Sequence, residues 1–217
     1  MSFIKAEKRG HTAVWTLLGS GSASLLSVYA LRDLHRNIDG VSEDSETSAI
    51  IITGGNYSFF SAGADLHELA ALDGDASLLF SRLGQCLFDK MELLPKPIIA
   101  AVDGYCMGGG LDLLLACDLR YATPESTFAH PGSRFGIITG FGGTVRLPVE
   151  TGRAKACDLF MTARKVDAEE ALEIGLINSV IDSKFLLERC LEIADGFEEV
   201  DQSLFRSYKN GAARGLF

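Results

Sequence analysis

The sequence lacks the features of a secreted, membrane-bound or metal-binding protein. Its five cysteines are odd in number and scattered, and none forms a C-x-x-C pair or joins a histidine-rich cluster. We therefore expect reduced, structural thiols, no metal site and a cytoplasmic setting. The first residues contain no apolar signal core, and no apolar run approaches the ~20 residues that a membrane span requires.

Positive charge is also scarce. The chain carries 20 Lys and Arg residues against 29 Asp and Glu residues, a net charge of −9. A nucleic acid or an anionic membrane surface binds to a basic face, so neither is an expected partner. The length of 217 residues is enough for one sizeable hydrophobic core.

The apolar pattern predicts an α/β protein with a mainly parallel sheet. Short apolar runs predict strands at residues 3–7, 12–17, 49–53, 98–102, 119–122, 127–129 and 176–181. Helical spacing predicts helices at residues 24–40, 78–94, 111–117, 167–175 and 184–197. We expect Ser24 to cap the first helix and Gly40 to end it. The run at 98–102 is uniformly apolar, which is typical of a strand buried on both faces.

Two loops of small residues follow buried strands, at residues 61–65 and 108–110. Such loops let the backbone approach a ligand closely, and two convergent amides could stabilise an oxyanion by roughly 3–4 kcal/mol per donor. The alternative is that the glycines only form tight turns and permit close packing of a helix on the sheet. Spacing alone leaves both interpretations open.

Four blocks resemble the crotonase superfamily of enoyl-CoA hydratases and isomerases. They are S-A-G-A-D-L at 61–66, K-P-I-I-A-A-V-D-G-Y-C-M-G-G-G-L-D-L-L-L-A-C-D-L-R-Y-A at 96–122, G-F-G-G-T-V-R-L-P at 140–148 and A-E-E-A-L-E-I-G-L-I-N-S-V at 168–180. The resemblance implies a crotonase-like spiral of ββα turns over residues 1–182, followed by a helical segment at 183–217 that is shorter than usual. It also implies a homotrimer or hexamer.

The resemblance also implies an acyl-CoA thioester as substrate, with coenzyme A bound as part of it and no other cofactor. By position, Ala64 and Gly109 match the residues whose amides form the oxyanion hole. Ala62 and Leu66, together with Ala64, match residues that line the adenine end of CoA, and Gly108 is a further expected substrate contact.

The chain departs from the family pattern at the acid/base positions. Hydratases of the family hold one water between two glutamates, and these positions match Asp112 and Gly132 here. Asp112 could be a general base, or it could be a structural carboxylate. His130 could face the same cavity as an acid/base, with Gly132 as a substrate contact, or it could be structural.

The residues therefore favour a thioester enzyme that stabilises an enolate. Double-bond isomerisation or another single-base reaction fits them better than standard hydration. One alternative is a non-catalytic acyl-CoA binder that has lost the acid/base glutamates. Another is a carbon–carbon bond hydrolase or decarboxylase of the same superfamily.

Overall fold

The computed structural model describes residues 2–19, 23–55 and 58–213. Its larger sheet has six strands in the order β1-β2-β4-β7-β9-β12, and only β1 runs antiparallel to its neighbour. Their bounds are β1 (Ile4–Arg9), β2 (Thr12–Leu17), β4 (Ala49–Gly54), β7 (Ile98–Val102), β9 (Leu119–Ala122) and β12 (Ser179–Val180). The predicted parallel sheet is confirmed.

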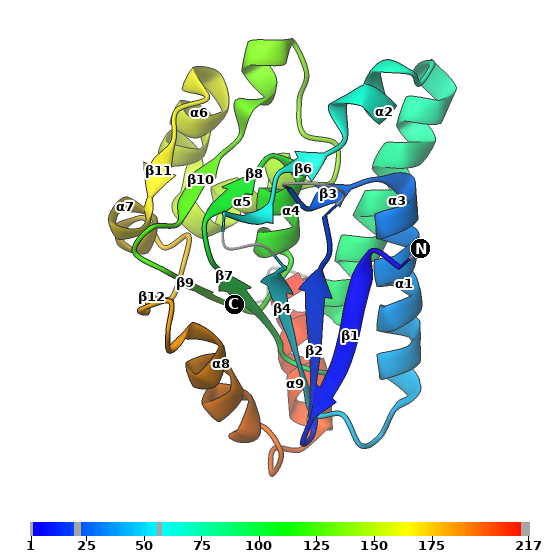
Figure 1. Cartoon of the computed structure of the whole chain (residues 1–217), viewed down its shortest axis with the longest axis vertical. Coiled ribbons are helices and arrows are strands. Elements are labelled where there is room, and N and C mark those ends of the chain that lie inside the picture. The colour runs from blue at the N-terminus through cyan, green and yellow to red at the C-terminus, as the bar shows by residue number, and fades with distance from the viewer. Residues whose placement is uncertain (1, 20–22, 56–57, 214–217) are drawn as a thin grey trace.

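A smaller sheet lies beside the larger one (Figure 1). Its order is β11 (Val166–Asp167), β10 (Thr127–Ala129), β8 (Tyr105–Met107) and β5 (Phe59–Ser61). A third pair joins β3 (Leu25–Leu26) to β6 (Gly63–Ala64). Successive turns of the chain add one strand to each main sheet and then a helix, as in β4-β5-α3, β7-β8-α4 and β9-β10-α5. The expected ββα spiral is therefore confirmed.

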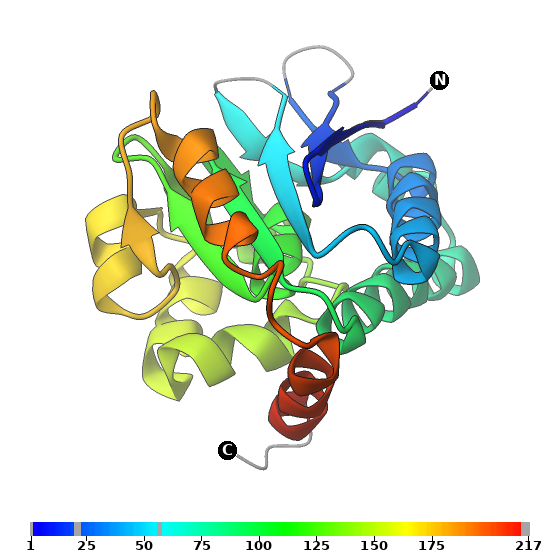
Figure 2. The ribbon, with the colours of Figure 1, turned by 90° about the horizontal axis from the view of Figure 1, so that it is seen from below.

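The helices surround these sheets. Their bounds are α1 (Val28–Glu43), α2 (Leu66–Ala70), α3 (Gly74–Leu93), α4 (Gly109–Leu115), the 3₁₀ helix η1 (Pro131–Phe135), α5 (Gly143–Thr151), α6 (Arg153–Thr162), α7 (Ala168–Glu173), α8 (Leu186–Asp195) and α9 (Gln202–Ala213). Helices α1 and α3 lie side by side, whereas α8 lies across the other face of the large sheet (Figure 2). In the described part of the chain, no helix is long and apolar enough to cross a bilayer.

Strand β7 shows why this sheet is buried on both faces. Ile98 and Val102 belong to the main core, which also contains apolar side chains of α1, α3 and α4. Ile99 and Ala101 point the other way, into a second core with α8. Successive side chains of a strand alternate between faces, so an uninterrupted apolar run is needed where helices cover both.

The first helix differs from the sequence expectation at both ends. Ser24 is not its cap: its hydroxyl donates to the Leu17 carbonyl oxygen at 2.9 Å. Ser27 caps α1 instead, accepting from the Ala30 amide at 3.2 Å. The helix also passes through Gly40 to Glu43. One glycine inside a helix costs only about 1 kcal/mol, which the burial of the following Val41 in the core can offset.

Helix α9 lies within the helical segment expected at 183–217, although the sequence pattern predicted no separate helix at these bounds. It packs along α3, and its Lys209 is buried. The Lys209 ammonium lies 2.6 Å from the Asp118 carboxylate and donates to the Lys96 carbonyl oxygen at 2.9 Å. These contacts join the last helix to the start of β7 and the end of α4.

Candidate active site

The glycine segment 108–110 forms the turn from β8 into α4. Gly108 has φ +52°, a left-handed conformation that favours glycine. The first intrahelical hydrogen bonds run from the Leu111 and Asp112 amides to the Gly108 carbonyl oxygen. The Gly109 amide therefore belongs to the helix start, where N–H groups have no intrahelical acceptor.

The other small-residue loop meets this helix start directly. A methyl group placed on Gly109 would lie 3.3 Å from the Ala64 backbone nitrogen. One placed on Gly63 would lie 2.7 Å from the Gly109 nitrogen. Gly63 has φ +88°, so this close approach again depends on glycine. Two loops far apart in sequence thus place the Ala64 and Gly109 amides together.

A cavity of about 880 Å³ opens at this junction. Seven of the eight predicted site residues line it: Ala62, Ala64, Leu66, Gly108, Gly109, His130 and Gly132. Most of the remaining lining is apolar, with Leu69, Phe80 and Phe160 among the larger side chains. The eighth residue, Asp112, is fully buried and does not line the cavity.

His130 follows β10 directly and lies beside the glycine turn, because the Gly108 amide donates to the Ala129 carbonyl oxygen at 2.9 Å. Its ring packs against Phe160 with centroids 4.8 Å apart. His130 Nε2 lies 3.3 Å from Asp112 Oδ1, and neither atom has an aligned hydrogen bond. His130 and Asp112 therefore form a contacting pair at the cavity wall.

Burial disfavours charge on both members of this pair. Loss of solvation raises the pKa of Asp112 to about 7, opposed by the hydroxyl of Thr139, which donates to Oδ2. Loss of solvation also lowers the pKa of His130 to about 4. Near neutral pH the imidazole is uncharged, and the carboxyl of Asp112 is close to its titration midpoint.

His130 is the only titratable side chain among the described residues that line the cavity. Four residues with hydroxyl groups also line the cavity: Ser77, Ser81, Ser133 and Thr139. Among the described lining residues, only His130 could therefore act as a general acid or base on a bound molecule. Asp112 contacts two lining residues, His130 through Oδ1 and Thr139 through Oδ2.

Gly132 lies in a closed turn. The Ile137 amide donates to the Gly132 carbonyl oxygen at 3.0 Å, and a methyl group on Gly132 would lie 2.6 Å from the Ile137 carbonyl oxygen. Any side chain here requires the backbone to move. A carboxylate side chain at this position would therefore collide with the backbone of Ile137.

Two cavity residues were missed in the sequence. Thr139 holds Asp112, and Phe141 packs against Gly109. Both lie in the glycine-rich segment that includes Gly136 and Gly140, where the only signal was a large ring among small residues. Such a ring needs space elsewhere in the fold, and the sequence does not reveal where.

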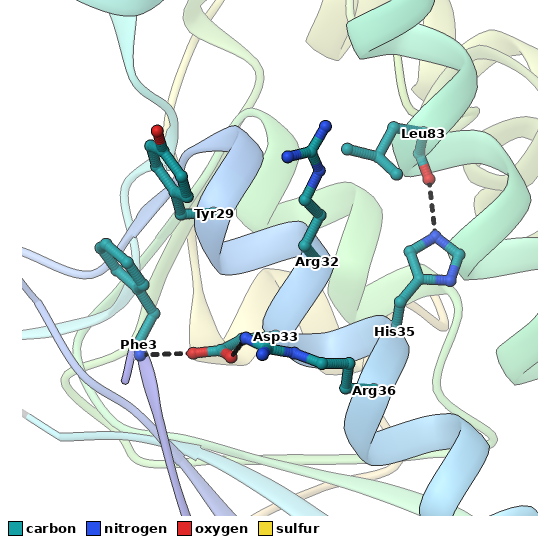
Figure 3. A pocket seen from close by; sticks show the side chains of 7 residues that line it. All are labelled: Phe3, Tyr29, Arg32, Asp33, His35, Arg36 and Leu83. Carbon is teal, nitrogen blue, oxygen red and sulfur yellow. Dashed lines mark hydrogen bonds and ion pairs between the residues drawn. The ribbon is translucent and has the colours of Figure 1, made fainter. Parts of the chain in front are cut away.

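A second cavity, of about 580 Å³, lies between the start of β1, α1 and α3 and contains none of the predicted site residues. Figure 3 shows that most of its polar groups are already paired. The Phe3 amide and the Arg36 guanidinium both donate to Asp33, and His35 Nε2 lies 3.2 Å from the Leu83 carbonyl oxygen. Among its described lining residues, this second cavity does not combine the backbone amides of a glycine-rich helix start with a titratable side chain, as the first cavity does. Within the described residues, no group of three or more His, Cys, Asp or Glu side chains could hold a metal ion.

A family model described as Enoyl-CoA hydratase/isomerase matches residues 24–214. The chain belongs to this family. It is 38% identical to the short-chain-enoyl-CoA hydratase of Clostridium acetobutylicum, over 87% of this chain and 72% of the relative. It is 35% identical to the crotonyl-CoA hydratase of Syntrophomonas wolfei, over 98% of this chain and 82% of the relative.

Solved structures agree with this membership. Pseudomonas aeruginosa DspI superposes with a TM-score of 0.93 at 33% identity, covering 99% of this chain and 88% of DspI. An enoyl-CoA hydratase from Bacillus anthracis also gives a TM-score of 0.93, at 31% identity over 99% of this chain and 84% of that one. The predicted crotonase fold and the predicted enzyme class, a member of the enoyl-CoA hydratase/isomerase family, are confirmed.

Proposed function

We propose that the chain binds an acyl-CoA thioester with its carbonyl oxygen between the amides of Ala64 and Gly109. His130 then moves the proton that forms and quenches the enolate. The observation that carries this proposal is the position of His130, the only titratable side chain among the described lining residues, beside those amides. Backbone donors aimed at a developing oxyanion lower the barrier by roughly 3–4 kcal/mol each.

Asp112 acts as a positioning residue in this proposal. When it is ionised, its Oδ1 can accept from His130 Nε2–H, which leaves Nδ1 as the basic nitrogen. The carboxylate then stabilises the imidazolium that forms during proton transfer. Thr139 holds the other carboxylate oxygen and so fixes the direction of Oδ1.

Double-bond isomerisation is the reaction that one acid/base performs most simply. The imidazole takes a proton from C2 of a 3-enoyl thioester, and the electron pair of that C–H bond delocalises onto the thioester oxygen. The imidazolium returns the proton to C4, and the double bond moves from C3–C4 to C2–C3. No water and no second base is needed, which suits a site with Gly132 at the second glutamate position.

Turnover of matched 2-enoyl-CoA and 3-enoyl-CoA substrates tests the proposal. We expect conversion of the 3-enoyl to the 2-enoyl thioester to be faster than addition of water. If calorimetry showed thioester binding while neither substrate reacted, the protein would be a non-catalytic acyl-CoA binder. Absence of both binding and turnover would contradict the proposed function and that alternative together.

Hydration is the second candidate, because relatives at 35–38% identity are named hydratases. His130 could activate a water beside the same oxyanion hole, without the second carboxylate. A 3-hydroxyacyl-CoA product formed faster than the isomer would favour this candidate. Assembly as a homotrimer or hexamer, a cytoplasmic setting and the division at residue 182 stay predictions, and sedimentation would test the first.

A further inference from the structure

We infer that Phe141 forms the floor of the acyl cavity and limits the substrate to thioesters with a short, uncharged hydrocarbon acyl chain. This inference rests on the proposed function, since it assumes a thioester carbonyl between Ala64 and Gly109. The ring of Phe141 lines the cavity next to Gly109. It therefore stands where the acyl chain leaves the carbonyl carbon.

The ring occupies a socket made by two glycines. A methyl group on Gly84 of α3 would lie 2.2 Å from a carbon of the Phe141 ring, and one on Gly109 would lie 2.9 Å from it. Real side chains do not approach that closely, so both helices need glycine opposite the ring. The ring fills the space between α3 and the start of α4.

Two further rings hold Phe141 in place. Phe80 packs against it at a centroid distance of 5.1 Å and an interplanar angle of 70°. Phe88 packs at 5.8 Å and 88°. Edge-to-face pairs are favourable, and a ring enclosed on these sides has no room to rotate away. Phe141 is thus a fixed barrier between the cavity and the core around Phe88.

The charge of the other lining residues determines whether the cavity accepts a charged or an uncharged acyl group. None of the described lining residues is a Lys, Arg, Asp or Glu, and His130 is uncharged near neutral pH. A free carboxylate at the end of the acyl chain would lose its hydration without gaining a counter-ion. An apolar acyl chain, by contrast, gains about fourfold in affinity for each buried methylene. The cavity therefore selects hydrocarbon acyl groups over dicarboxylic ones.

Removing the ring tests the length limit. In Phe141→Ala the cavity extends toward Phe88, and an apolar space of this kind stays dry and accepts apolar groups. We expect kcat/KM of the native chain to stop rising early in a series of about four to about ten acyl carbons. In the variant it should continue to rise by about fourfold per carbon for roughly two further carbons.

Ile38→Ala is the matched control. It removes a fully buried side chain from the same core, but Ile38 does not line the cavity and is not one of the two rings that pack against Phe141. Its melting temperature should fall as in Phe141→Ala, while its chain-length profile stays native. Phe141→Leu is a smaller change and should shift the chain-length profile by an intermediate amount. It replaces the alanine variant if that variant does not fold.

The outcomes separate the two claims. If the native chain turned over no short enoyl-CoA, the proposed function would fail. If it did, but the folded Phe141 variants kept the native chain-length profile, the inference alone would be overturned. Pentanoyl-CoA and glutaryl-CoA have equal carbon counts, and binding of glutaryl-CoA as tight as that of pentanoyl-CoA would overturn the charge selection.

Discussion

The two sides of the cavity differ in what they are made of. On one side, the Ala64 and Gly109 amides are backbone groups whose positions follow from the turn and helix start at Gly108. On the other side, the groups proposed to move protons are side chains, with His130 Nε2 lying 3.3 Å from Asp112 Oδ1. A fold retains backbone donors under substitution, whereas the groups that move protons can be exchanged while the cavity remains.

The largest loss of activity should come from replacing His130, the side chain proposed to move protons. We expect His130→Gln to lower kcat by roughly 10²- to 10⁴-fold with little change in KM, because general acid–base catalysis contributes that much. The measurement is steady-state isomerisation of a 3-enoyl-CoA.

His35→Gln is the control, since His35 lines the other cavity, away from the thioester. It should leave kcat unchanged. A His130→Gln variant with native kcat would remove His130 from the mechanism.

Gly109→Ala tests the proposed oxyanion hole formed by the Ala64 and Gly109 amides. The new methyl group would lie 2.9 Å from the Phe141 ring and 3.3 Å from the Ala64 nitrogen, between the two amides. We expect kcat to fall by about 10²- to 10³-fold, the range for loss of an oxyanion donor. Gly40→Ala adds a methyl group to α1 with no atom within 4 Å, and it should keep full activity. Equal rates for both variants would contradict the proposed oxyanion hole.

Asp112→Asn should change how stability depends on pH. The pKa of Asp112 is raised to about 7 in the folded chain, from an ordinary value of 3.8, so the folded state holds this proton more tightly. The resulting stabilisation is present below the unfolded pKa and is lost as the pH rises through the folded pKa. Asparagine has no proton to lose.

The asparagine variant should therefore gain on the order of 3 kcal/mol relative to the native chain between about pH 5 and about pH 8. Urea unfolding at the two pH values measures this difference. A constant difference would mean that Asp112 titrates normally. In the same account, kcat/KM of the native chain rises as Asp112 ionises around neutral pH, and the variant lacks this rise.

The smallest effect concerns the missing glutamate. Gly132→Glu should lower the melting temperature and should not increase hydration, because a side chain at Gly132 collides with the Ile137 carbonyl oxygen. Gly40→Glu makes the same substitution at an exposed position of α1 that does not line the cavity, and it serves as the control. A gain in hydration rate for Gly132→Glu alone would show that only the residue type separates this site from a two-glutamate hydratase.

The sequence predicted the central parts of the fold well. The run 98–102 predicted a strand buried on both faces, and the glycines after it predicted the start of α4. These signals are local, since apolar periodicity and glycine turns act within a few residues. Ser24 was assigned wrongly because Ser27 has the same capping chemistry, and only tertiary packing decides which serine starts the helix.

The site was predicted only in part, because local sequence signals do not show which distant side chains come into contact. Family motifs indicated which segments converge, and the cavity contains seven of the eight residues. The contact between His130 and Asp112 joins β10 to α4, and the socket of Phe141 joins a loop to α3 and α4. Neither contact leaves a pattern along the chain, because each depends on the distance between segments that only the folded structure sets.

Exchange of the C2 protons of butyryl-CoA in deuterated water tests the central claim most directly. A saturated thioester can neither isomerise nor take up water, so exchange reports enolate formation alone. We expect the native chain to incorporate deuterium, and both His130→Gln and Gly109→Ala to lose at least about 100-fold of that rate. Native-like exchange in His130→Gln, or no exchange by a native chain that binds butyryl-CoA, would contradict the account.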